Sequence, residues 1–271
     1  MEPIARSDEE LKQHELERQR TSNAILESDA PKKLIVAGPG TGKTHNFRRV
    51  LEGAGDGVAL TFIRALKREL ERDLGDIAQV NTFHGYCNFL AHKLGGVGGL
   101  TAKFHYYPLL PELVIKDIEA LGLAKQEVAG LDHLIHRMEG DDELLLASLE
   151  MGNYYAAVGH TDIVDHGQQH QAERPDEIPH HEVLDVDEYQ DFNLLDTSLI
   201  DILSRKSPVL IAGDDDQALY DFRDASPQFI RDLDGRDDVE RFHLPYCSRC
   251  TEVVVEAVNH LVREAQARAV G

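Results

Sequence analysis

The stretch Ala37-Gly38-Pro39-Gly40-Thr41-Gly42-Lys43-Thr44 decides the fold class of this 271-residue chain. It fits the pattern G-x-x-x-x-G-K-[ST], follows the apolar run Leu34-Ile35-Val36, and precedes a segment with helical spacing. Glycines in such a loop let backbone N–H groups turn toward phosphate oxygens, and the N-terminus of the next helix adds partial positive charge. The stretch therefore predicts a strand–loop–helix unit that binds the phosphates of a nucleotide.

A second string, Val186-Asp187-Glu188-Tyr189-Gln190-Asp191, closes the apolar segment 182–186 and supplies two adjacent carboxylates. We expect Lys43 to reach the β- and γ-phosphates, and Thr44 and Asp187 to hold Mg²⁺. Glu188 is expected to act as the base for the attacking water. A glycine-rich turn without a ligand would explain the first string alone. The two strings together predict hydrolysis of a nucleoside triphosphate.

The composition argues against exported, membrane-spanning and disulfide-stabilised proteins. The sequence has no signal peptide, that is, no charged N-terminal segment followed by an apolar stretch. It also has no apolar run of about 18 residues that could span a membrane. We therefore expect a soluble cytoplasmic protein without a membrane partner. The three cysteines, Cys87, Cys247 and Cys250, are too few for a disulfide framework. Cys247 and Cys250 have C-x-x-C spacing, but no second pair exists to complete a zinc or iron–sulfur site.

The formal net charge of −21 argues against broad electrostatic capture of nucleic acid. The acidity is concentrated in residues 112–196, where only Lys116, Lys125, Arg137 and Arg174 oppose a long series of carboxylates. A solvated acidic surface is the simplest explanation.

Strand-like and helix-like segments alternate along most of the chain. A helix is expected over residues 9–27, and six apolar segments are predicted to be strands, at residues 34–37, 57–62, 77–80, 183–186, 208–212 and 241–244. Helix-length amphipathic stretches lie between most of them. This alternation predicts an α/β fold with a parallel sheet, whose ligand groups lie at the C-terminal ends of the strands.

The alternation breaks between residues 95 and 181, where we predict an inserted α-helical subdomain. Residues 111–122 and 127–151 have helical spacing, and the return over residues 159–181 is expected to be an exposed loop. The core would then consist of residues 1–94 and 182–271. Five histidines in the return could bind a metal, but their spacing matches no ligand pattern: His160, His166, His170, His180 and His181.

Further motifs, in order along the chain, resemble those of the UvrD/Rep family of superfamily 1 DNA helicases. Leu60-Thr61-Phe62-Ile63-Arg64-Ala65-Leu66-Lys67-Arg68-Glu69-Leu70 resembles its second motif, and Asn81-Thr82-Phe83-His84-Gly85-Tyr86-Cys87 its T-F-H-S-x-C motif. Residues 187–191 are similar to D-E-x-Q-D, and residues 213–223 to G-D-x-D-Q-S-I-Y-x-[FW]-R-G-A. Residues 244–249 are similar to L-x-x-N-Y-R-S, and Gln19 stands where the family's adenine-reading glutamine belongs. The resemblance covers the chain except the insertion and implies a RecA-like P-loop NTPase core.

The resemblance implies an ATP site with Mg²⁺ as cofactor. Catalytic roles would belong to Lys43 and Glu188, to Gln217, which senses the γ-phosphate, and to Arg249, which contacts it. Asp187 and Thr44 would bind the metal. The implied nucleotide-binding positions are Gln19, Gly38, Pro39, Gly40, Thr41, Gly42, Lys43, Thr44, His45 and Arg249.

The resemblance also implies a path for single-stranded DNA, on which aromatic faces stack against bases without reading their sequence. The matching positions are Phe62, Arg64, Thr82, His84, Tyr220, Phe222 and Arg223. Ordinary core packing is the alternative explanation for Phe62 and Phe222.

Three positions depart from the family pattern. Arg64 replaces an asparagine, His45 replaces an arginine, and Ser248 replaces a tyrosine that stacks on adenine, although Tyr246 lies two residues earlier. These departures bear on nucleotide affinity and base preference.

The sequence ends at Gly271, whereas family members continue into a second RecA-like motor domain. The preferred interpretation is the N-terminal ATP-binding domain of a UvrD-like ATP-dependent DNA helicase. It would bind single-stranded DNA weakly alone, and would couple ATP hydrolysis to translocation only with a second motor domain, in cis or on a partner subunit. The alternative is a stand-alone nucleotide-binding regulatory or defence-system subunit without helicase activity. An unrelated P-loop enzyme such as a small kinase has no need for the motifs at 61–87 and 213–223.

Overall fold

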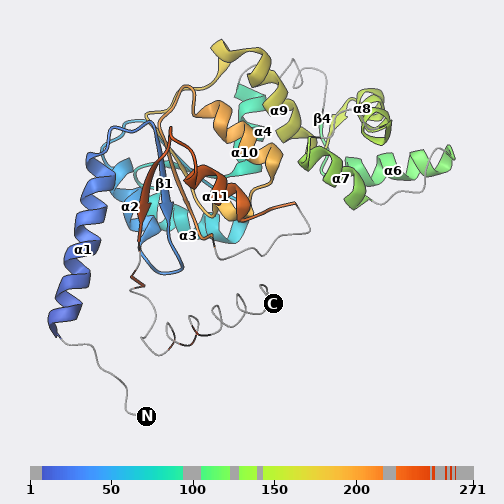
Figure 1. Cartoon of the computed structure of the whole chain (residues 1–271). Helices are drawn as coiled ribbons and strands as arrows, with labels where there is room; N and C mark the ends of the chain where they lie inside the picture. Colours follow the sequence, from blue (N-terminus) through green and yellow to red (C-terminus); the bar gives the residue numbers. More distant parts are fainter. Residues whose placement is uncertain are drawn as a thin grey trace.

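The computed structural model describes residues 8–93, 105–122, 128–138, 143–215, 224–244, 246–247 and the single positions 254, 257 and 260. A six-stranded parallel sheet with the order β3-β2-β6-β7-β1-β8 forms its centre (Figure 1). Its strands are β1 (Lys32–Val36), β2 (Gly57–Thr61), β3 (Gln79–Thr82), β6 (Val183–Val186), β7 (Val209–Gly213) and β8 (Glu240–His243). The predicted α/β fold with a parallel sheet is confirmed, and each predicted strand overlaps an observed one.

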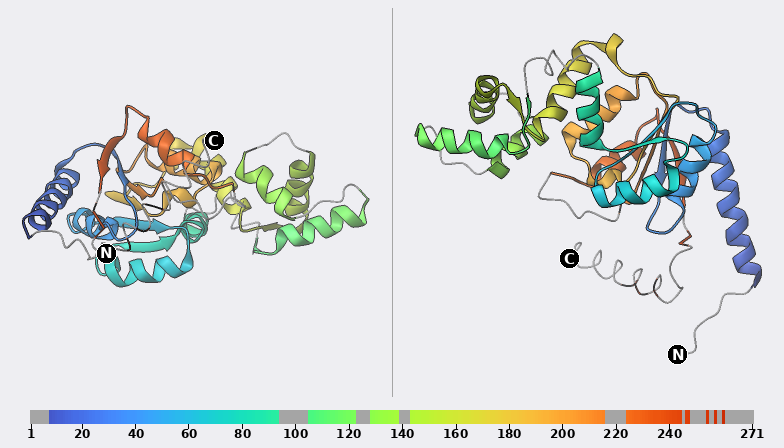
Figure 2. Two further views of the ribbon diagram at one scale, coloured as in Figure 1. Left: turned by 60° about the horizontal axis from the view of Figure 1, so that its bottom comes forward. Right: turned by 180° about the vertical axis from the view of Figure 1, so that it is seen from behind.

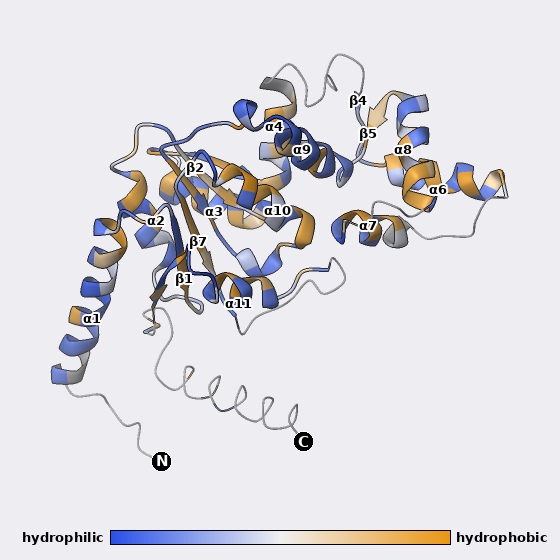
Figure 3. Cartoon of the chain, turned by 45° about the horizontal axis from the view of Figure 1, so that its top comes forward, coloured by the Kyte–Doolittle hydropathy of each residue, from blue (hydrophilic) through white to orange (hydrophobic). Residues whose placement is uncertain are grey.

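Alternate residues of each strand point to opposite faces of the sheet, and helices cover both faces. In β1, Ile35 packs with the face covered by α2 (Lys43–Leu51) and α3 (Arg64–Leu74), whereas Leu34 belongs to the opposite hydrophobic cluster. That second face is covered by α4 (Phe83–Lys93), α10 (Leu194–Leu203) and α11 (Gln228–Asp234). Figure 3 shows the apolar strands between helices whose outer surfaces are hydrophilic.

Helix α1 (Asp8–Glu27) projects from one end of the sheet (Figures 1 and 2). Its C-terminal turn is fixed to the core, because Ile25 is fully buried and its carbonyl accepts a hydrogen bond from Lys33 Nζ at 3.0 Å. Within the described residues, no helix is both long enough and apolar enough to span a membrane.

The region predicted as an insertion contains α6 (Leu110–Ala120), α7 (Val128–His136) and α8 (Glu143–Tyr155), which lie beside the sheet (Figures 1 and 2). Two strands too short to give a sequence period, β4 (His105–Tyr106) and β5 (Ala157–Val158), pair in parallel next to them. The boundaries at residues 95 and 181 stay a prediction.

The return segment differs from the prediction of an exposed loop. It forms helix α9 (Asp162–Glu173), which packs against α4 and α10 and buries Ile163, Val164 and Gln171. The loop prediction was wrong because polar side chains occupy buried positions of this helix and hide its period. A short 3₁₀ turn, η2 (Pro175–Glu177), follows.

Candidate functional site

The phosphate-binding loop joins β1 to α2 and has the backbone conformation that its glycines predict. Gly40 and Gly42 have φ angles of 70° and 104°, a region that favours glycine. A Cβ added to Gly42 would meet nothing within 4 Å, so its φ angle, rather than crowding, accounts for the glycine. The Thr41 hydroxyl donates to the Gly38 carbonyl at 2.8 Å and closes the loop.

Lys43 and Glu188 meet at the C-terminal ends of β1 and β6, as the sequence predicted for one site. Lys43 Nζ lies 3.2 Å from Glu188 Oε2, which also accepts a hydrogen bond from Gln190 Nε2 at 2.7 Å. Gln190 Oε1 in turn accepts the backbone N–H of Asp214 at 3.1 Å. A continuous chain of contacts therefore joins the phosphate-binding loop, the end of β6 and the end of β7. Gln190, on the short 3₁₀ turn η3 (Tyr189–Asp191), was not predicted to have a role.

Asp187 is buried, and its environment suits a cation. Burial, together with the neighbouring Glu188, raises the pKa of Asp187 to about 7, although Lys43 opposes the shift. Burial and Glu188 likewise raise the pKa of Asp191 to about 6. Among the described residues, no group donates a hydrogen bond to Asp187 Oδ1. This buried acceptor fits the expected Mg²⁺, which proteins often bind through one or two carboxylates plus substrate phosphates.

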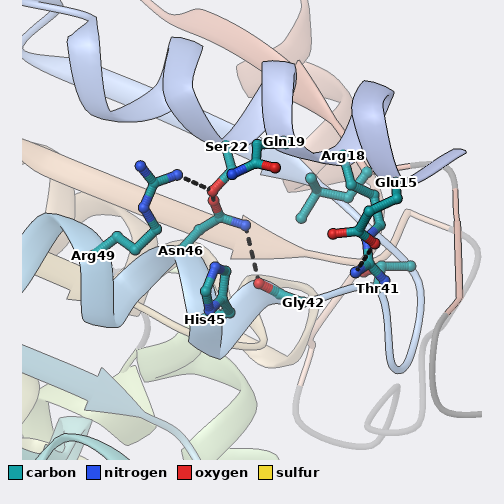
Figure 4. Close-up of a pocket in the computed structure, with 10 residues that line it drawn as sticks. Glu15, Arg18, Gln19, Ser22, Thr41, Gly42, His45, Asn46 and Arg49 are labelled. Carbon is teal, nitrogen blue, oxygen red and sulfur yellow. Dashed lines mark hydrogen bonds and ion pairs between the residues drawn. The ribbon is translucent and has the colours of Figure 1, made fainter. Parts of the chain in front are cut away.

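Two cavities flank the loop. The first, of about 340 Å³, is lined by Lys43, Thr44, Asp187 and Glu188 among others, and so brings together the predicted metal and phosphate residues. The second, of about 530 Å³, lies between α1 and α2, where the predicted Gln19 and His45 both line it (Figure 4).

A hydrogen-bond network among residues that line the second cavity was missed by the sequence analysis. Ser22 of α1 donates to Asn46 Oδ1 at 2.6 Å and accepts from Arg49 Nη1 at 2.6 Å, and Asn46 Nδ2 donates to the Gly42 carbonyl at 3.0 Å (Figure 4). The network therefore ties the helix that carries Gln19 to the phosphate-binding loop. Ser22, Asn46 and Arg49 belong to no motif, and only the structure shows that Ser22 and Asn46 are buried.

Tyr246 does not line the cavity. Its ring stacks on His14 of α1, with centroids 3.9 Å apart, and its hydroxyl donates to Glu17. Five of the predicted site residues lie outside the described residues: Gln217, Tyr220, Phe222, Arg223 and Arg249. Ser248, which replaces the tyrosine of the family pattern, also lies outside them.

The described residues of the predicted DNA path lie at the β2–β3 end of the sheet. Phe62 directly follows β2, and Thr82 is the last residue of β3, which pairs with β2. Arg64 begins α3, and its side chain is exposed. Phe62 is half-buried and packs edge-on against Phe192, with centroids 5.6 Å apart. His84 is buried, and its ring stacks on His160 of the return segment at 4.1 Å.

Three further histidines of the return segment have separate partners. His170 pairs with Glu177 at 2.8 Å, His180 with the Lys206 carbonyl at 2.6 Å, and His181 with Tyr86 at 2.8 Å. No group of three or more His, Cys, Asp or Glu side chains in the described part of the chain could hold a metal ion.

Comparison with known proteins agrees with this geometry. A family model described as an AAA domain matches residues 21–223. The chain is similar to the ATP-dependent DNA helicase PcrA of Staphylococcus aureus (strain NCTC 8325 / PS 47) at 25% identity, and to that of Staphylococcus epidermidis (strain ATCC 12228 / FDA PCI 1200) at 24%. Each match covers 91% of this chain but only 40% of the relative. The chain therefore belongs to the AAA domain family, and the predicted resemblance to UvrD/Rep-like helicases is confirmed.

Proposed function

We propose that this chain binds Mg·ATP and hydrolyses it, as the N-terminal ATP-binding domain of a UvrD-like DNA helicase. The observation that carries the proposal is the contact chain from Lys43 through Glu188 and Gln190 to Asp214 at the C-terminal ends of adjacent strands. The proposal is supported by the ordered motifs and by the similarity to PcrA proteins, which are ATP-dependent DNA helicases.

Each side chain of the site would have a separate role in ATP binding or hydrolysis. An ammonium group has three N–H donors, so Lys43 can pair with Glu188 and still donate to β- and γ-phosphate oxygens. Among the described residues, both side-chain bonds to Glu188 reach Oε2, so Oε1 is the oxygen that would accept a proton from the attacking water. Thr44 and Asp187 would hold Mg²⁺, which would supply positive charge to offset the negative charge of the phosphates. Gln19 and His45 would contact the base in the larger cavity.

The chain spans 40% of the length of the PcrA relatives, so helicase activity would belong to an assembly with a second motor domain, in cis or on a partner. In that assembly, Phe62, Arg64 and Thr82 would form one wall of a path for single-stranded DNA. The net charge of −21 favours the second candidate, a nucleotide-binding regulatory or defence-system subunit without translocation. DNA-stimulated ATPase activity in the presence of the second motor domain would distinguish the two.

Isothermal titration calorimetry with Mg·ATP tests the site. Lys43→Ala should abolish measurable binding, because the β/γ-phosphate charge loses its partner. Glu188→Gln should retain binding but lose turnover, because a carboxamide cannot take up the proton. Lys206→Ala, which changes an exposed lysine in the turn after α10, serves as the control. Equal ATP affinity in wild type and Lys43→Ala would refute the assignment.

A further inference from the structure

A third cavity, of about 200 Å³, lies between α10 and α11, which cover the same face of the sheet (Figure 1). Because Leu194 lines this α10–α11 cavity and is 43% exposed, the cavity is reached from the surface. Among the described residues, it shares no lining residue with either cavity beside the phosphate-binding loop. Its aliphatic and phenyl walls come from α10, β7 and α11: Leu194, Ile200, Val209, Ile211, Phe229 and Leu233.

Three hydroxyl groups in the wall of the α10–α11 cavity already have partners within the chain. Thr197 and Ser204 donate to backbone carbonyls of α10, at 3.0 and 2.6 Å, and Ser198 accepts from Gln168 of α9 at 3.1 Å. A cavity holds a water molecule firmly only where polar groups remain to bind it. Because these hydroxyls are satisfied and the remaining wall is largely apolar, the favoured occupant is an apolar group.

The size of the cavity suits one side chain better than a whole small molecule. Small-molecule sites usually have volumes of about 300–1,000 Å³. At about 200 Å³, the α10–α11 cavity is smaller than these, but it can take a single large apolar side chain. In protein interfaces, aromatic side chains inserted into such pockets supply much of the binding free energy, and the contacts around them exclude water.

The rim of the cavity carries more negative than positive charge. Lys32 and Arg236, the two cations in its lining, are both paired with Asp201 and Asp238, at distances of 2.8–3.2 Å. Asp232 of α11 is exposed and adds a third carboxylate. A cation beside the inserted side chain would complement this rim. A second copy of the chain, with a net charge of −21, would complement it less well.

We propose that the α10–α11 cavity is a docking site for a partner protein that inserts one aromatic side chain flanked by Lys or Arg. The satisfied hydroxyls and apolar walls select the apolar group, the volume limits it to one ring, and the rim selects the flanking cation. The docking site is separate from the two cavities beside the phosphate-binding loop, so partner and nucleotide can be bound together. It goes beyond the proposed function and does not depend on nucleotide binding.

NMR titration of the 271-residue chain, labelled at Ile, Leu and Val methyl groups, tests the proposal with three capped tripeptides. Acetyl-Lys-Phe-Lys-amide should shift the methyl signals of Ile200, Ile211 and Leu233, which line the cavity. Acetyl-Lys-Ala-Lys-amide should bind at least about tenfold more weakly, because it has no ring to bury. Acetyl-Glu-Phe-Glu-amide should bind at least about threefold more weakly, because its carboxylates face the acidic rim.

Two pairs of variants locate the binding of acetyl-Lys-Phe-Lys-amide. Leu194→Ala removes an apolar wall at an exposed position and should weaken binding several-fold, whereas Leu146→Ala, at a 50% exposed position on α8, should not. Asp232→Asn should weaken binding by about twofold. Its matched control is Glu119→Gln, which removes an exposed carboxylate on α6 and should leave the affinity unchanged. Saturating Mg·ADP should also leave it unchanged.

The proposal would be overturned if acetyl-Lys-Phe-Lys-amide left the Ile200, Ile211 and Leu233 signals in place, or if the Phe and Ala tripeptides bound equally well. Equal affinity for the Lys and Glu tripeptides would rule out a basic partner. If the same signals shifted with protein concentration before any tripeptide was added, a second copy would be the occupant and the proposal would be wrong. A chain that bound no nucleotide would contradict the proposed function instead, and the tripeptide affinities would still decide this proposal.

Discussion

At the scale of single residues, Asp185 is the least expected side chain of the core. It lies in the middle of β6, in register with Ala59 of β2 and Leu210 of β7, and is fully buried. Burial and the nearby Asp187 raise the pKa of Asp185 well above its usual value, and Lys33 offsets only part of this. Within the described part of the chain, neither of its carboxyl oxygens has a hydrogen-bond partner. An unsatisfied buried polar group of this kind destabilises the fold.

We therefore predict that Asp185→Val stabilises the chain by about 1–3 kcal/mol, because the desolvation cost disappears and a β-branched residue suits a buried parallel strand. Urea denaturation measures the change. Asp196→Val is the matched control, since Asp196 is equally buried but completes a capping box with Asn193 at the start of α10. That variant should lose about 1 kcal/mol or more. A destabilised Asp185→Val protein would contradict the argument.

A second residue-scale prediction concerns Gly213 at the end of β7. A Cβ there would lie 2.5 Å from Ile230 Cδ1 and 2.9 Å from Gln190 Oε1. Gly213→Ala should therefore displace Gln190 from Glu188 and Asp214, and should lower kcat for ATP more than it raises Kd. Gly167→Ala, whose new methyl group would meet Leu199 at an ordinary 3.8 Å, is the control. Normal turnover in Gly213→Ala would show that Gln190 does not orient Glu188.

The sequence predicted Lys43, Thr44, Asp187 and Glu188 as one site, and the structure brings them together. Those predictions were possible because ligand chemistry sets both the residue type and the local spacing. The contacts of Ser22 with Asn46 and with Arg49 join segments far apart in the chain. No local pattern encodes such pairs, so they became visible only in three dimensions.

At the scale of elements, helix α1 depends on its contact with α2. Ser22→Ala should leave the buried Asn46 Oδ1 without its donor and remove a partner of Arg49. We expect a loss of about 1–2 kcal/mol in the free energy of unfolding. We also expect weaker ATP binding, because Gln19 lies on the same helix. Ser204→Ala, which removes only a bond to the Asp201 carbonyl at the end of α10, should leave ATP affinity unchanged. Thermal denaturation and calorimetry measure the two effects.

Elements were predictable where apolar spacing was regular. Each of the six strands of the central sheet overlaps a short, largely apolar segment, and each was found within a few residues. Helix α9 was missed because His170, Gln171 and Asp162 occupy buried positions, so hydrophobicity alone shows no period there. The packing of α9 against α4 and α10 depends on residues at least 69 positions earlier and at least 21 positions later, which a local window does not contain.

At the scale of the whole molecule, a network of ion pairs ties the amino end of the sheet to the helices. Lys32 of β1 lies 2.8 Å from Asp201 and 3.2 Å from Asp238, and Arg236 lies 3.1 and 2.8 Å from the same two carboxylates. The hydrogen bond from Arg236 holds the pKa of Asp238 well below its usual value. Burial raises the pKa of Asp201, but hydrogen bonds and charge from Lys32 and Arg236 outweigh it and lower the pKa overall.

Because both carboxylates have lower pKa values in the folded chain, their contribution to stability is fully present above the unfolded value of about 4. The contribution is lost progressively as pH falls from that value through the lower folded-state pKa values. We predict that the stability difference between wild type and Arg236→Met, about 1 kcal/mol at pH 7 for these partly exposed pairs, begins to shrink below about pH 4 and continues to shrink as pH is lowered further. Urea denaturation at several pH values gives the comparison. A difference that stayed constant with pH would mean that the network contributes through packing alone.

The distribution of charge over the whole molecule sets the expected affinity for DNA. With a net charge of −21 and few cations along the proposed wall, single strands should bind with Kd no better than about 10⁻⁴–10⁻⁶ M, with a shallow dependence on salt. Base stacking on Phe62 should supply much of that affinity. Phe62→Leu keeps the apolar contact with Phe192 but removes the aromatic face, so it should weaken binding by at least about fivefold.

Fluorescence anisotropy with a labelled oligonucleotide measures this effect, and two controls locate it. Phe89→Leu changes an exposed phenylalanine on α4, and Tyr154→Ala changes an 80% exposed ring on α8. Neither should alter affinity, because stacking requires an aromatic face on the strand's own path. If Tyr154→Ala weakened binding sharply while Phe62→Leu did not, the DNA would lie across the acidic helical region. The C-terminal edge of β2 and β3 would then have no part in the path.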